Sequence, residues 1–88
     1  MSLHLCPCCD YATLEERGVY DICPVCFWED DGQDVDALDR VSGPNHITLR
    51  EGRRHFLSCG ACDPSMLKHV CSVAARRQFA HHPREVEG

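Results

Sequence analysis

Two short runs of β-favouring residues stand near the N-terminus, at residues 11–14 and 19–22. Both contain β-branched or aromatic residues beside polar ones, which is typical of short strands. Gly18, between the runs, can supply the positive φ of a tight turn. The pattern therefore predicts a β-hairpin from residue 11 to residue 22.

Helical signals appear in the second half of the chain. Thr48 and Glu51 have the spacing of a capping box, in which two side chains bond to backbone groups at a helix start. The apolar residues that follow share one helical face: Leu49, Phe56 and Cys59. Gly60 suits the left-handed residue that commonly ends a helix. We expect a helix over residues 49–59.

A second helix is predicted to begin with Asp63 as its N-cap and Pro64 in its first turn. The apolar residues beyond follow the i, i+3, i+4, i+7 spacing of a buried stripe: Leu67, Val70, Cys71 and Ala74. We expect this helix to reach about Phe79. Residues 1–80 would then form a single domain, and residues 81–88 a polar, flexible tail.

The small size of the chain indicates that its fold needs a cross-link. An apolar core gives a chain of 88 residues only marginal stability, so domains of this size often add disulfides, a metal or a partner. The chain has 8 cysteines, and its first residues do not resemble a secretory signal. No apolar run approaches the roughly 20 residues of a membrane span. We therefore expect a cytoplasmic protein whose cysteines bind zinc rather than form disulfides.

Two Cys-Pro-x-Cys units, at residues 6–9 and 23–26, give the strongest chemical signal. Two C-x2-C pairs about 15 residues apart are typical of zinc sites, because tetrahedral Zn²⁺ takes four soft ligands. The predicted ligands are Cys6, Cys9, Cys23 and Cys26, holding one structural Zn²⁺ per chain. Cys8, adjacent to a ligand, is expected to be a bystander near the surface. A closed four-thiolate shell leaves no position for a substrate, so we expect no catalysis at this metal.

A third C-x2-C unit, Cys59 and Cys62, leaves several interpretations open. The two residues are separate members of the core, a redox pair, or part of a second metal site with His46, His55 or Cys71. The two histidines suit turn-capping or surface positions, since neither stands in a recognisable nucleophile motif.

The charge of the chain bears on its partner. A net charge of −5 favours a basic protein over nucleic acid, because phosphate neutralisation supplies most non-specific nucleic-acid affinity. Acidic residues gather over residues 29–39: Glu29, Asp30, Asp31, Asp34, Asp36 and Asp39. This acidic loop is a solvated surface, a docking surface for a basic partner, or a second metal site.

Two other groups of side chains have alternative interpretations. Arg50, Arg53 and Arg54 form a basic cluster that is neutralised by the acidic loop or is a weak nucleic-acid patch. Phe27 and Trp28 directly follow the second Cys-Pro-x-Cys unit, where large aromatics usually shield a metal and fill the core. An exposed Trp28 would instead serve as an interface anchor.

These motifs together resemble the bacterial cysteine-rich CPCC domain family. The resemblance covers residues 4–70 and implies a zinc ribbon with a short helical part, without an assigned activity. Its most specific part is the central run YDICPVCFWEDDG. The matching segments are residues 6–9, 20–32, 43–46, 49–51, 60–63 and 67–70.

The chain departs from the family pattern at several places. Asp10 stands where the family usually has Gly, and Asp takes a left-handed conformation only at some cost. Phe27 has the equivalent place after the second unit and suits that conformation poorly, so we expect the two turns to differ in backbone shape. Cys59 is not part of the family pattern, and residues 71–88 are unmatched.

The sequence thus predicts a single α+β domain: a zinc ribbon made of a β-hairpin with two Cys-Pro-x-Cys turns, then an acidic loop and two helices. We expect a non-enzymatic protein-binding module without membrane contact. Its most concrete form is an immunity or antitoxin protein that occludes a basic toxin through the acidic loop. A nucleic-acid-binding zinc ribbon is the alternative, on fold-level analogy alone, and a thiol-redox protein follows it.

Overall fold

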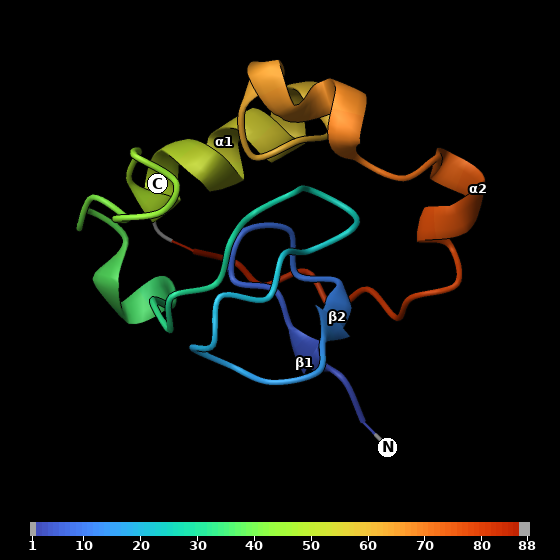
Figure 1. The fold of residues 1–88 in the computed structure, drawn as a ribbon, viewed down its shortest axis with the longest axis horizontal. Coiled ribbons are helices and arrows are strands. Elements are labelled where there is room, and N and C mark those ends of the chain that lie inside the picture. Colours follow the sequence, from blue (N-terminus) through green and yellow to red (C-terminus); the bar gives the residue numbers. More distant parts are fainter. Residues whose placement is uncertain (1, 87–88) are drawn as a thin grey trace.

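Short elements frame a loop-rich centre in the computed structural model, which describes residues 2–86. They are β1 (His4–Leu5), β2 (Ala12–Leu14), the 3-10 helix η1 (Val35–Ala37), α1 (Leu49–Cys59), the 3-10 helix η2 (Pro64–His69) and α2 (Val73–Arg76). Figure 1 shows α1, η2 and α2 as an arc over the loops of the N-terminal part, with the C-terminal segment returning across the centre. The result is a small α+β fold.

The two strands form an antiparallel hairpin that differs from the predicted one. β1 pairs with β2, His4 opposite Leu14 and Leu5 opposite Ala12, with an irregular register between these pairs. The hairpin therefore encloses the first Cys-Pro-x-Cys unit. Residues 19–22, predicted as the second strand, form no strand.

Hydrogen bonds to Asp30 explain why residues 19–22 do not pair with β2. Tyr20 has a left-handed φ of 66°, which interrupts an extended run. Its N–H donates to the carbonyl of Asp30 at 2.8 Å, and the Asp30 N–H donates to the carbonyl of Asp21 at 2.9 Å. The Asp30 carboxylate also accepts the N–H of Gly18 at 2.8 Å. This segment thus pairs with the start of the acidic loop. The β propensity of residues 19–22 does not indicate which segment they pair with.

The helix over residues 49–59 is confirmed with both of its predicted ends. Thr48 accepts the N–H of Glu51, and the Glu51 carboxylate accepts the N–H of Thr48, so the capping box is complete. Gly60 has a left-handed φ of 91° and donates its N–H to the carbonyl of Phe56. Of its predicted apolar face, Leu49 is fully buried and Phe56 is partly buried against the core.

The second predicted helix is wrong in length. Asp63 caps η2 as expected and Pro64 stands in its first turn, but η2 ends at His69. The chain is then extended where the N–H of Cys71 donates to the carbonyl of Pro24 at 2.9 Å, and Ser72 caps the new helix α2. The predicted stripe is consequently not buried: Leu67 and Ala74 are exposed, and Val70 and Cys71 are half-buried.

Trp28 lies at the centre of a core made mostly of cysteines. Its ring is completely buried and packs against α1 at Gly52. This confirms the prediction that Trp28 fills the core. The other buried apolar residues are Cys6, Cys8, Cys9, Leu14, Cys23, Val25, Cys26, Leu49, Ala61 and Cys62.

Gly52 gives a first prediction, because an added Cβ would lie 2.8 Å from Cζ3 of Trp28. We expect Gly52→Ala to destabilise the fold by about 1–3 kcal/mol, the usual cost of overpacking, despite the better helix propensity of alanine. Chemical denaturation measures this. The matched control is Gly43→Ala, since nothing lies within 4 Å of a Cβ there. Equal stability of the two variants would contradict the packing.

The segment that we expected to be a flexible tail, residues 81–88, has specific partners at several residues. Directly before it, Ala12 donates its N–H to the carbonyl of Ala80 at 2.8 Å, and within it His82 donates its N–H to the carbonyl of Asp10 at 3.0 Å. The ring of His81 stacks on that of Tyr11, with 4.0 Å between centroids. The last two residues of the predicted tail lie outside the described part.

Within the described residues, no helix is both long and apolar enough to span a membrane.

Candidate metal centre

The two Cys-Pro-x-Cys units form two backbone loops of the same shape, the first knuckle (residues 6–10) and the second knuckle (residues 23–27). In the first, Asp10 donates its N–H to the carbonyl of Cys6 at 2.9 Å; in the second, Phe27 donates to the carbonyl of Cys23 at 2.8 Å. Each knuckle thus closes on its own first cysteine. This closure turns both cysteines of a unit towards the same point.

The expected difference in shape between the knuckles is wrong. Asp10 and Phe27 both take left-handed conformations, with φ of 64° and 70°. Holding two sulfurs and a closing hydrogen bond fixes the backbone at the last position, whichever residue stands there. The Phe27 ring stacks on that of His69 at 4.7 Å between centroids. Conformational propensities of single residues do not include such a contact. Tertiary structure therefore overrides the local preference of phenylalanine.

The four predicted ligand residues are brought together and buried. Their sulfur atoms all lie within 4.8 Å of one another: Cys6, Cys9, Cys23 and Cys26. Cys6 Sγ is 3.6 Å from Cys26 Sγ, and Cys9 Sγ is 3.7 Å from Cys23 Sγ. A tetrahedral metal with bonds of about 2.3 Å to sulfur requires sulfur–sulfur separations of about 3.8 Å. The cluster can therefore hold a metal ion of this geometry.

The thiols of the cluster share their protons unequally. The pKa of Cys23 lies far below its ordinary value, because the thiols of Cys26, Cys6 and Cys9 are hydrogen-bonded to it. Thr13 Oγ1 adds a further hydrogen bond to Cys23 Sγ at 3.1 Å. Burial raises the pKa of Cys6 and of Cys26. A divalent cation stabilises the deprotonated form of all four thiols and displaces their protons.

Cys8 was predicted to lie near the surface, and this is wrong. It is buried beside α1. A Cβ at Gly52 would lie 3.4 Å from Cys8 Sγ, which places this sulfur against the helix. The interpretation of Cys8 as outside the metal-ligand set agrees with the sulfur cluster among residues 2–86.

Cys59 and Cys62 lie in different environments. Cys62 is buried, and burial raises the pKa of its thiol to about 12, which disfavours the reactive thiolate. Cys59 is half-buried and its Sγ lies 3.8 Å from the carbonyl of Ala61. His55 Nδ1 is hydrogen-bonded to the carbonyl of Cys62 at 2.9 Å. Within the described residues, the four-cysteine cluster is the only group with metal-binding spacing.

The acidic loop is largely neutralised inside the domain. Asp30 is completely buried; burial alone would raise its pKa, but hydrogen bonds from Arg17 and two backbone amides outweigh this and lower it. Four aspartates pair with arginines: Asp30 and Asp34 with Arg17, Asp34 with Arg84, Asp31 with Arg40, and Asp39 with Arg50. Glu29 and Asp36 are the loop carboxylates without such a pair in the described part of the chain.

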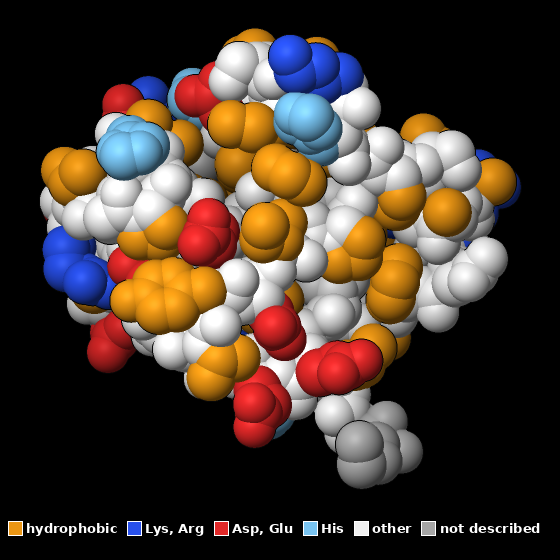
Figure 2. Space-filling view, viewed as in Figure 1, with side chains coloured by type: hydrophobic (Ala, Val, Ile, Leu, Met, Phe, Trp, Pro, Cys, Tyr) orange, Lys and Arg blue, Asp and Glu red, His pale blue; other side chains and the backbone are white. Residues whose placement is uncertain are grey.

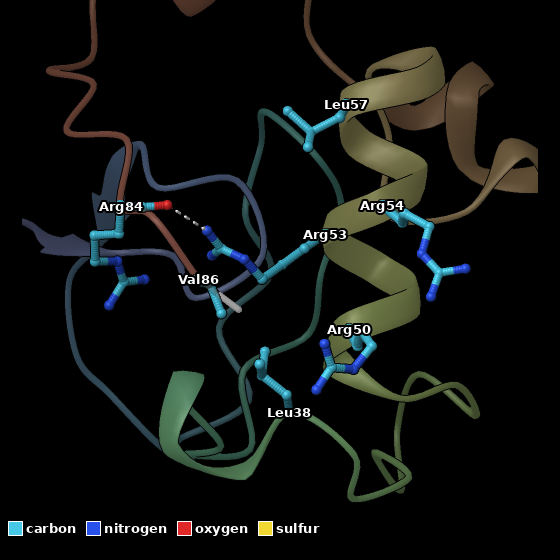
Figure 3. A pocket seen from close by; sticks show the side chains of 7 residues that line it. All are labelled: Leu38, Arg50, Arg53, Arg54, Leu57, Arg84 and Val86. Carbon is cyan, nitrogen blue, oxygen red and sulfur yellow. Dashed lines mark hydrogen bonds between the residues drawn. The ribbon is translucent and has the colours of Figure 1, made fainter. Parts of the chain in front are cut away.

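The basic cluster on α1 is also mostly neutralised. Arg50 pairs with Asp39 at 2.8 Å, and Arg53 pairs with Asp10, not with the acidic loop, at 2.8 Å. Figure 3 shows the hollow of about 150 Å³ between α1 and the C-terminal segment, where Arg53 reaches the carbonyl of Arg84. Arg54 also lines this hollow. The surface therefore offers little of the continuous positive charge that phosphate binding requires.

Sequence reasoning missed the role of Asp10. Its carboxylate is buried and accepts hydrogen bonds from Arg53 Nη2 at 2.8 Å and from Arg84 Nη2 at 2.6 Å. The Arg84 N–H adds a third at 2.8 Å. These bonds connect the first knuckle to α1 and to the C-terminal segment, an arrangement that we call the Asp10 clamp. No local sequence pattern predicts the Asp10 clamp, because its members are far apart in the sequence.

The fold and the sulfur cluster define a class: a small α+β cysteine-rich domain with a four-cysteine cluster that can bind a metal. Comparison with family models is more specific. The model of the cysteine-rich CPCC family matches residues 4–77, so the chain belongs to this family. The match extends beyond residue 70, where the resemblance seen in the sequence ended. Comparison with curated proteins and with solved structures gives no match.

Proposed function

We propose that the cluster of four cysteines binds one zinc ion per chain and that this ion is structural. Four soft thiolate donors at tetrahedral spacing support zinc over hard cations. Every donor is buried, and four sulfurs complete the coordination shell, so no position is left for a substrate. We therefore propose that the protein is not an enzyme and that its surface carries the function.

We further propose that this metal-stapled scaffold binds another protein. The observation that carries this proposal is the closed, buried cluster, because it provides rigidity without a reaction centre. The net charge of −5 supports a basic partner. Because four aspartates of the acidic loop are paired internally, the loop can contribute only its remaining carboxylates, Glu29 and Asp36. An immunity or antitoxin protein that occludes a basic toxin in the cytoplasm is the most concrete form of this proposal.

Affinity capture with the zinc-loaded protein tests the binding role. We expect it to retain a basic protein whose elution requires increased salt, since electrostatic complementarity makes association salt-sensitive. The matched control is the chelator-treated protein, which should retain nothing specifically. A gel shift with nucleic acid in low salt is expected to show no complex. Nucleic-acid binding under those conditions, without protein capture, would replace this proposal by the alternative.

A further inference from the structure

An apolar groove lies between the second knuckle, residues 44–47 and the start of η2. It has a volume of about 270 Å³ and is walled by Ile22, Phe27 and Met66. Ile22 is 47% exposed although it is a large hydrophobic residue. Figure 2 shows hydrophobic side chains gathered over the centre of the viewed face with acidic side chains among them. Such a concave apolar surface is typical of an interaction site.

The charges that line this groove have one sign at neutral pH. Glu29 and Asp63 are its acidic members, and no lysine or arginine of residues 2–86 lines it. Asp63 is hydrogen-bonded to the N–H of Ser65 at 2.9 Å, whereas the Glu29 carboxylate has no ion-pair partner among residues 2–86. The groove therefore combines an apolar floor with an acidic rim. Positive charge on an occupant would complement it.

The walls of the groove are held in place before anything binds. Phe27 and His46 both have left-handed φ values, 70° and 66°, and each is fixed by a backbone hydrogen bond. A bulky residue in this region is uncommon and persists where the surrounding structure imposes it. The stacking of Phe27 on His69 further restricts the ring. A preorganised wall reduces the entropy lost on binding.

We propose that this groove binds a basic segment of a partner protein, with one apolar side chain seated against Phe27 and Met66 and a lysine or arginine beside Glu29 and Asp63. The proposal rests on the proposed function, because it names the surface that the metal-stapled scaffold presents. It moves the contact away from the acidic loop's paired aspartates and onto the second knuckle.

Synthetic peptides of equal length test the groove by backbone amide NMR of the zinc-loaded full chain. One peptide combines lysine and leucine, a second lysine and serine, and a third glutamate and leucine. We expect the first to shift the amides of Ile22, Phe27, Glu29 and Met66, and the other two to leave them unmoved. Shifts confined to other residues, or equal binding of the glutamate peptide, would overturn the proposal. Concentration-dependent shifts of these amides without peptide would show that a second copy occupies the groove instead.

Paired substitutions sharpen this test. Ile22→Ser should raise the Kd of the first peptide by about fivefold or more, as for a buried interface side chain. Glu29→Gln should raise it by roughly twofold to fivefold, and less in high salt. The matched controls outside the groove are Leu57→Ser, at a residue 85% exposed on α1, and Glu85→Gln; both should leave the Kd unchanged. Unchanged Kd values for the groove variants would contradict the proposal.

The same experiment separates the groove from the proposed function. The amide spectrum and the zinc content of the free protein report on the scaffold before any peptide is added. A dispersed spectrum with bound zinc and no peptide shifts would overturn the groove alone. Absence of zinc would overturn the proposed function itself. A captured partner that binds the groove variants as tightly as the wild type would likewise reject the groove and leave the binding role standing.

Discussion

Removal of the metal is expected to unfold the N-terminal half of the chain. The two knuckles are joined through the sulfur cluster, and the surrounding core is small, with cysteines as many of its members. A structural zinc contributes on the order of 10–16 kcal/mol of apparent binding free energy. A whole domain is stable by only about 5–15 kcal/mol. The binding free energy lost with the ion therefore equals or exceeds the free energy of unfolding of a typical domain.

Trp28 provides the measurement for this prediction. It is the one tryptophan of the sequence and is completely buried beside the knuckles. We expect a chelator to shift its fluorescence to longer wavelength and to abolish the cooperative unfolding transition. Cys26→Ser should do the same without a chelator and should lose the bound metal. Cys59→Ser is the matched control, because Cys59 lies outside the cluster. An unchanged emission spectrum after complete metal removal would contradict the structural role.

Substitution of Asp10 is expected to give the largest loss of stability outside the metal cluster. Removing one member of a buried ion pair typically costs about 3–5 kcal/mol, because the remaining charge is left without its partner. Asp10 is buried and pairs with both Arg53 and Arg84, of which Arg84 keeps a second partner in Asp34. Asp10→Ala should additionally incur backbone strain of about 1–2 kcal/mol, since residue 10 is left-handed.

The choice of replacement separates these two effects. Asp10→Asn keeps the size and the left-handed tolerance but loses the charge, so it should destabilise less than Asp10→Ala. Asp36→Asn is the matched control at an exposed aspartate. Chemical denaturation of the metal-loaded proteins gives the unfolding free energies. Limited proteolysis should show the C-terminal segment cleaved first in Asp10→Asn. Equal stability of Asp10→Asn and Asp36→Asn would show that the clamp contributes nothing.

The pH dependence of this difference follows from the pKa of Asp10. Burial would raise that pKa, but hydrogen bonds from Arg53 and Arg84 outweigh burial and lower it. A group whose pKa is lower in the folded state stabilises the fold above its unfolded pKa of about 3.9 and loses this effect as the pH falls further. The difference between wild type and Asp10→Asn should therefore stay constant from about pH 8 to about pH 5.

Local signals in the sequence predicted the features that local chemistry determines. The spacing of the four ligand cysteines and the capping box of Thr48 each act within a few residues, and the structure has both. The length of the second helix was wrong, because the bond from Cys71 to Pro24 interrupts it. That bond connects two segments whose proximity depends on the complete fold.

The features that the sequence did not reveal depend on contacts between distant residues. Asp10 stands 43 residues from Arg53 and 74 from Arg84, so no window of the sequence shows them together. The predicted partner of β2 was wrong for the same reason, since the carboxylate and backbone of Asp30 hold the segment that we took for a strand. The pairing of the acidic loop with Arg17 and Arg84 was not predicted either, because these arginines stand far from the loop in the sequence.

The Asp10 clamp also sets an order of events during synthesis. All four cysteines of the cluster have been added once residue 26 is in the chain, whereas Arg84 comes 74 residues after Asp10. A nascent chain can therefore assemble its sulfur cluster while α1 and the C-terminal segment are still to be made. During that interval the Asp10 carboxylate lacks both arginines that pair with it in the fold. Arg84, which is added 74 residues after Asp10, then connects the C-terminal segment to the first knuckle.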